Sequence, residues 1–172
     1  MSWIEDIKEV LPEYAKDIKL NLDAVIIRSS LPLEEAYGCA LAAAMSAGNG
    51  KIVSHIASEM ATDMATEQNA ALAAATIMAM NNTWYPYVEM TGDPNLKGLP
   101  AQLRMNAIAS HGGTTKERFE AYSLAASIVG KCHFCVKAHY DGLKKMGYTV
   151  EQLRDIGRIA AVMNSVCRLM IG

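Results

Sequence analysis

Apolar positions along the chain gather in segments rich in alanine, methionine and leucine, and short polar breaks separate these segments. Three breaks match a capping box, in which a hydroxyl and a later carboxylate or amide satisfy free N–H groups: residues 2–5, 114–117 and 149–152. Glycines at 48, 50, 112 and 113 add further breaks, and strand signals are scarce. The pattern predicts an all-α protein with helices near 2–10, 12–28, 33–47, 50–64, 67–81, 100–110, 115–130, 132–146 and 150–170.

The middle of the chain is predicted to be a long connector. Residues 81–100 contain Pro86, Pro94 and Pro100 together with two glycines, and these residue types usually end helices. The sequence therefore places a loop from Asn81 to Pro100, with one helical half on each side.

The two halves share short sequences in the same order. Glu-Ala-Tyr at 35–37 recurs at 120–122, Glu-Gln at 67–68 recurs at 151–152, and Met-Asn at 80–81 recurs at 163–164. The offsets are 85, 84 and 83 residues, although alanine-rich helices also resemble one another by chance. We interpret residues 1–172 as one domain with a degenerate repeat at 33–82 and a second repeat at 118–165 that carries a CxxC pair.

Composition narrows the class of protein. The chain has 172 residues, and 51% of them are hydrophobic, which suffices for a substantial core in one domain. The net charge of −2 and the lack of a basic stripe argue against a nucleic-acid surface. Apolar runs such as residues 70–80 are too short to cross a bilayer, and the N-terminus does not resemble a signal peptide. We therefore expect a soluble cytoplasmic protein.

The segment after Lys131 carries the chain's clearest chemical pattern. If a helix begins near Cys132, a rotation of about 100° per residue puts Cys132, Cys135 and His139 on one stripe. His133 lies off that stripe by about 100°. One helix face then presents two thiols and an imidazole.

This arrangement suits thiol chemistry. The free N–H groups of a first helical turn favour a thiolate, His139 can take the proton of Cys135, and Glu120 on the preceding helix can orient His139. A thiolate attacks the O–O bond of a peroxide, and a second nearby thiol converts the resulting sulfenic acid into a disulfide. The pattern indicates a thiol-based peroxide reductase.

Other interpretations fit parts of the pattern. A lone CxxC arises by chance, and Cys39 and Cys167 are expected to be inert buried thiols. A zinc-stabilised interaction module would use Cys132, Cys135 and His139, but the chain has no second pair of ligands with suitable spacing. Haem attachment needs histidine directly after the second cysteine, and thioredoxin needs strands that this chain lacks.

The spacing of these residues also resembles a known family. Glu120, eleven residues, Cys132, two residues, Cys135, three residues and His139 resembles the signature of the AhpD alkylhydroperoxidases, within the carboxymuconolactone decarboxylase-like superfamily. Segments 11–22, 78–82 and 103–106 also resemble that family, so the resemblance covers nearly the whole chain. Some relatives carry histidine directly before the second cysteine, where this chain has Phe134 beside His133.

The resemblance implies an AhpD-like helical fold, a homotrimer and an antioxidant alkyl hydroperoxide reductase that holds no bound cofactor or metal. Cys135 would be the peroxidatic thiol and form the sulfenic acid, and Cys132 would be the partner thiol, a proton donor exposed to the reductant. Glu120 and His139 would form a proton relay, with His133 as a candidate accessory group. Reduction of the disulfide would come from lipoyl groups on a dihydrolipoamide acyltransferase, recharged by dihydrolipoamide dehydrogenase, and the protein would also serve the peroxiredoxin AhpC. A thiol–disulfide carrier with little peroxidase activity is the alternative.

Overall fold

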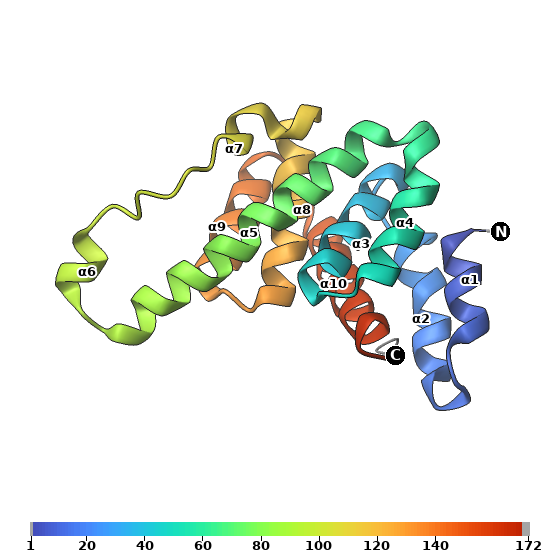
Figure 1. Cartoon of the computed structure of the whole chain (residues 1–172). Helices are drawn as coiled ribbons and strands as arrows, with labels where there is room; N and C mark the ends of the chain where they lie inside the picture. Colours follow the sequence, from blue (N-terminus) through green and yellow to red (C-terminus); the bar gives the residue numbers. More distant parts are fainter. Residues whose placement is uncertain (1, 170–172) are drawn as a thin grey trace.

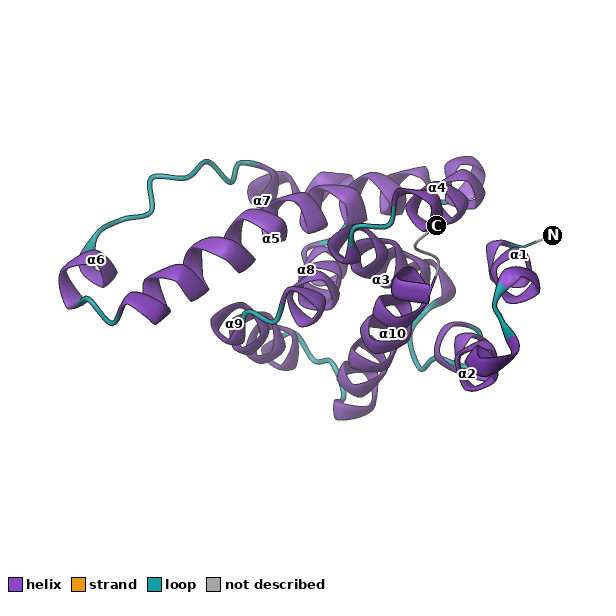
Figure 2. Ribbon diagram, turned by 60° about the horizontal axis from the view of Figure 1, so that its bottom comes forward, coloured by secondary structure: helices purple, strands orange, loops and turns teal. Residues whose placement is uncertain are grey.

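A computed structural model describes residues 2–169, so residue 170 of the last predicted helix lies outside the described part. Residues 2–169 contain helices and loops but no strand, which confirms the predicted all-α class (Figure 2). The elements are α1 (Trp3–Val10), η1 (Glu13–Ala15), α2 (Lys16–Ile26), α3 (Leu33–Ala47), α4 (Gly50–Asp63), α5 (Ala65–Thr91), α6 (Pro94–Gly98), α7 (Ala107–Ser110), η2 (His111–Gly113), α8 (Lys116–Gly130), α9 (His133–Lys145) and α10 (Val150–Leu169). None of the described helices is long and apolar enough to cross a membrane.

Helices α3 and α8 form the centre of the molecule, and α5 and α10 pack against both (Figure 1). Every residue of α3 from Ala36 to Ala44 is buried, and most of them are alanine or glycine. These small side chains allow the neighbouring helices to pack closely. At one crossing the ring of Tyr122 lies directly on Gly38, where a Cβ would come within 2.3 Å of the ring. Burial and the carboxylate of Glu67, which accepts a hydrogen bond from the Tyr122 hydroxyl, raise the pKa of Tyr122. The core therefore depends on glycine and alanine at helix contacts.

The linker between α2 and α3 is fastened to α10 by one buried carboxylate. Asp155 accepts hydrogen bonds from the backbone N–H of Ser30 at 2.9 Å and from its hydroxyl at 2.8 Å. Arg154 and Arg158 contact the other carboxylate oxygen. Against the opposing effect of burial, these donors hold the pKa of Asp155 at about 2, below its usual value of 3.8. Ionised Asp155 thus stabilises the packing of the N-terminal helices on the core.

Two predicted helix starts match their caps. The backbone N–H of Thr149 donates to Gln152 Oε1 at 2.9 Å, and the N–H of Gln152 donates back to Thr149 Oγ1 at 3.1 Å. Ser2 Oγ accepts from the N–H of Glu5 at 3.4 Å. The third start is displaced by one residue. Thr115 caps α8, and the hydroxyl of Thr114, predicted as the cap, donates to Glu67 instead.

The predicted loop from Asn81 to Pro100 is wrong over most of its length, because α5 extends into it and α6 (Pro94–Gly98) lies within it. Helix α5 continues to Thr91 with Pro86 in its interior, and it carries α6 away from the body of the protein (Figure 1). Proline removes only one backbone hydrogen bond, the one to the carbonyl four residues earlier. The ring of Tyr85, the residue before Pro86, packs on Phe134 of α9 with centroids 4.6 Å apart, so a tertiary contact holds α5 beside the proline. The helix predicted at 100–110 is absent up to residue 106, and the chain becomes helical only in α7, which η2 follows.

The two halves match in helix lengths and caps. Helices α3 and α8 each have 15 residues, and α4 and α9 have 14 and 13. Asn49 caps α4 by accepting from the N–H of the residue three positions later, as Cys132 does in α9. Helices α3 and α8, and likewise α4 and α9, align with an offset of 83 residues, whereas α5 and α10 begin 85 residues apart, so the duplication stays a prediction. The offset of 83 residues aligns Glu120 with Tyr37, not with Glu35 as the recurring Glu-Ala-Tyr sequence suggests.

Candidate active site

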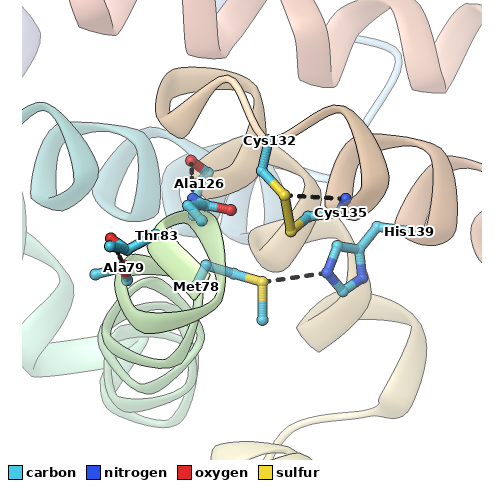
Figure 3. The surroundings of a disulfide bond; sticks show 8 residues. Met78, Ala79, Thr83, Ala126, Cys132, Cys135 and His139 are labelled. Atoms are coloured by element: carbon cyan, nitrogen blue, oxygen red, sulfur yellow. Dashed lines mark hydrogen bonds between the residues drawn. A yellow bond between two sulfur atoms is a disulfide. The ribbon is translucent and has the colours of Figure 1, made fainter. Parts of the chain in front are cut away.

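The two cysteines of the CxxC pair lie at the start of α9. Cys132 is the N-cap, and its sulfur accepts a hydrogen bond from the N–H of Cys135 at 3.2 Å. The two sulfurs are joined in a disulfide, and the Cα atoms are 5.3 Å apart (Figure 3). A helix N-terminus stabilises negative charge, so the first turn of α9 suits a thiolate that forms there after reduction.

Helix α5 contacts the turn that precedes Cys132. Asn82 Nδ2 donates to the carbonyl oxygen of Ala126 in the last turn of α8 at 3.3 Å. The Asn82 side chain also lies against Gly130, where a Cβ would come within 2.1 Å of Nδ2. Lys131 then adopts a left-handed conformation that ends α8 and turns the chain into α9. Glycine at 130 thus lets α5 approach the turn that positions the disulfide.

The predicted approach of Glu120 to His139 is present. Helices α8 and α9 pack against each other, and Glu120 Oε2 lies 2.6 Å from Nδ1 of His139. The side chains are only 20% and 16% exposed, so water screens the contact weakly. An ionised carboxylate only accepts hydrogen bonds, so this contact is a hydrogen bond when Nδ1 carries a proton.

The second ring nitrogen of His139 has a partner that the sequence did not reveal. Nε2 lies 3.2 Å from the sulfur of Met78, a buried residue of α5. Figure 3 shows the thioether and the imidazole on the same side of the disulfide, with the sulfur of Cys135 turned towards them. Met78 belongs to an alanine- and methionine-rich segment in which nothing distinguishes it from core residues.

The expected exposure of Cys132 to a reductant is wrong for this disulfide form. Cys132 is 0% exposed and Cys135 is 4% exposed. The intervening residues His133 and Phe134 are on the surface and line a groove of about 870 Å³ together with Tyr85 and other residues of α5 and α6. Cys132 is buried because its side chain turns inward to cap α9, and a reductant reaches it only when neighbouring side chains move.

The geometry gives no support for the zinc alternative. Cys132 and Cys135 are bonded to each other, and no group of three or more acidic, histidine or cysteine side chains within residues 2–169 is arranged to hold a metal ion. The other cysteines are buried free thiols. Burial raises the pKa of Cys39 well above its usual value and that of Cys167 to about 12, so both remain protonated near neutral pH.

Comparison with known proteins agrees with this site. Residues 94–170 match the model of the Carboxymuconolactone decarboxylase family. Over 168 residues the chain is 42% identical to alkyl hydroperoxide reductase AhpD of Rhodospirillum centenum, covering 97% of this chain and 90% of the relative. It is 38% identical to AhpD of Hyphomonas neptunium, with 97% and 93% covered, and 40% identical to AhpD of Coxiella burnetii, with 98% and 97% covered. The chain therefore belongs to the AhpD family, within the carboxymuconolactone decarboxylase-like superfamily.

Proposed function

We propose that this protein is an antioxidant enzyme that reduces alkyl hydroperoxides through a Cys132–Cys135 dithiol–disulfide cycle. The observation that carries the proposal is the contact of Glu120 with His139, one helical turn from Cys135, in a site whose two sulfurs form a disulfide. The AhpD relatives are named as alkyl hydroperoxide reductases, which supports the same substrate class.

The proposed oxidation has two steps. The thiolate of Cys135 attacks one peroxide oxygen, the O–O bond breaks, and the leaving alkoxide takes a proton to become the alcohol. His139, held by Glu120, or the thiol of Cys132 supplies that proton. Cys132 then attacks the sulfur of the Cys135 sulfenic acid, and water leaves as the disulfide forms. The peroxide gains the two electrons that the dithiol loses.

Regeneration of the dithiol needs a two-electron donor. We propose that a lipoyl group on a dihydrolipoamide acyltransferase supplies these electrons, that dihydrolipoamide dehydrogenase recharges it, and that the dithiol form also reduces AhpC. A slender dithiol arm suits the apolar groove beside Phe134, because Trp84 and Tyr85 line it next to the CxxC segment. His133 also lines this groove, so an accessory role for it would be in contact with substrate or reductant.

A cytoplasmic homotrimer is part of the proposal. The end of α5 and α6 project from the body in both views, and Tyr87, Met90 and Leu99 there are exposed (Figures 1 and 2). Packing of this arm on another copy would remove its apolar side chains from water. Light scattering coupled to size-exclusion chromatography tests the trimer, and a monomeric mass at micromolar concentration would contradict it.

The test of function is peroxide turnover driven by dihydrolipoamide. We expect Cys135→Ser to abolish consumption of an alkyl hydroperoxide, and Cys39→Ser, which removes a buried thiol elsewhere, to leave it unchanged. Unchanged turnover in Cys135→Ser would falsify the assignment. Stopped-flow mixing of the dithiol form with peroxide distinguishes a thiol–disulfide carrier. A carrier would be reduced rapidly by dihydrolipoamide but would react negligibly with peroxide.

A further inference from the structure

The imidazole of His139 is held at both nitrogens by residues of two other helices. Glu120 of α8 lies 2.6 Å from Nδ1, and Met78 of α5 lies 3.2 Å from Nε2. Met78 is 1% exposed, so its thioether is part of the packed interior and does not reach the ring by chance from solvent. The proposed function assigns roles to Glu120 and His139 but leaves this third contact without a purpose.

Hydrogen-bonding chemistry specifies what the contact needs. A thioether sulfur has no proton to donate and is a weak acceptor. The contact between Met78 and Nε2 is therefore a hydrogen bond only when Nε2 carries a proton. Both contacts are hydrogen bonds at the same time only when each ring nitrogen carries a proton, so that Nδ1 donates to the carboxylate of Glu120 and Nε2 donates to the sulfur of Met78.

We propose that Met78 is a positioning residue that holds the Nε2–H of His139 beside Cys135 while the cysteines are in the disulfide form. The proposal rests on the proposed function and deepens its reductive half. A thioether orients the N–H without retaining its proton, because it is a weaker acceptor than a carbonyl or a carboxylate. When Cys135 becomes a thiolate, its negative charge makes it the better acceptor for the same N–H.

The proposed reduction consists of two thiol–disulfide exchanges. A thiolate of an external dithiol attacks the sulfur of Cys132 and forms a new S–S bond, while the Cys132–Cys135 bond breaks. The electron pair of that bond moves to the sulfur of Cys135, which takes the proton from Nε2 of His139. Nδ1 keeps its proton on the side of Glu120. The second thiol of the reductant then displaces Cys132, and the reductant leaves as a disulfide.

The test replaces the thioether without emptying the core. Met78→Leu keeps the apolar volume but removes the acceptor, and Met60→Leu makes the same change at another fully buried methionine. With ¹⁵N-labelled histidine in the oxidised protein, NMR measures exchange of the ring N–H protons with water, and His139→Phe identifies the signals. We expect Met78→Leu to accelerate exchange of the Nε2–H about tenfold and to leave the Nδ1–H unchanged, with Met60→Leu like wild type.

A second measurement follows the step itself. We expect dihydrolipoamide to reduce the disulfide about three- to tenfold more slowly in Met78→Leu than in wild type or Met60→Leu. Unchanged Nε2–H exchange in Met78→Leu, or an equal change in Met60→Leu, overturns the proposal. Absence of peroxide turnover in wild type refutes the proposed function alone, because the exchange measurement on the disulfide form does not depend on peroxide.

Discussion

The contact between Glu120 and His139 allows a quantitative prediction for Glu120→Gln. Glutamine keeps the length and an acceptor oxygen for the Nδ1–H but removes the negative charge. Hydrogen bonds to charged groups contribute about 1.5–3 kcal/mol and neutral ones about 0.5–1.5 kcal/mol. At 2.6 Å between partly buried side chains, we take the difference as about 1.4 kcal/mol, which corresponds to about a tenfold lower kcat for peroxide turnover.

The assay is steady-state reduction of an alkyl hydroperoxide with dihydrolipoamide in excess. Glu117→Gln is the matched control, because Glu117 lies on the same helix but is exposed at its first turn. Its kcat should stay within about twofold of wild type. Thermal unfolding of both variants shows whether the substitution affects folding as well. A Glu120→Gln enzyme that is folded and as active as the control would refute the reasoning, because the charge would then have no effect on the relay.

Three further predictions concern the fold and the spare thiols. Asp155→Asn should lower the free energy of unfolding by about 2 kcal/mol at pH 7. Because the folded pKa of Asp155 is depressed, this difference is complete above pH 3.8 and disappears as the pH falls through about 2; urea titrations at pH 7 and pH 2 check it. Gly38→Ala should lower the free energy of unfolding by about 1–3 kcal/mol, because the added Cβ overlaps the Tyr122 ring. Gly157→Ala has open space around it and should raise the free energy of unfolding by about 1 kcal/mol in the same denaturant titration. Equal effects of the two substitutions would contradict the packing argument. Cys167, buried with a pKa of about 12, should react with a thiol reagent only as fast as the protein unfolds, and rapid labelling of the native protein would disprove this.

Local sequence signals predicted the helices well where caps or glycines mark their ends. Helix α3 has the bounds that its flanking breaks indicated, and the reciprocal contacts of Thr149 and Gln152 start α10 as expected. Pro86 was misleading because a helix tolerates the loss of one backbone hydrogen bond when tertiary contacts, such as Tyr85 with Phe134, hold the residues beside the proline. No local sequence pattern predicts such a contact between residues far apart in the chain.

The sequence predicted only those parts of the candidate site that lie close together along the chain. Helical periodicity placed Cys132, Cys135 and His139 on one face, and the position of Glu120 on the preceding helix suggested that it would approach His139. The contribution of α5 was not predictable, because Met78 and Asn82 contact α9 and α8 only in the folded protein. The inward turn of the capping sulfur also depends on that packing, which is why both sulfurs are buried.

Direct trapping of the oxidised cysteine tests the central claim. In Cys132→Ser the partner thiol is absent, so a sulfenic acid formed by peroxide on Cys135 cannot condense and can be labelled with dimedone. Mass spectrometry of the digested protein after one equivalent of alkyl hydroperoxide should find the label on Cys135 and not on the buried Cys39 or Cys167. A label on either buried cysteine, or no label at all, would contradict the peroxidatic role of Cys135.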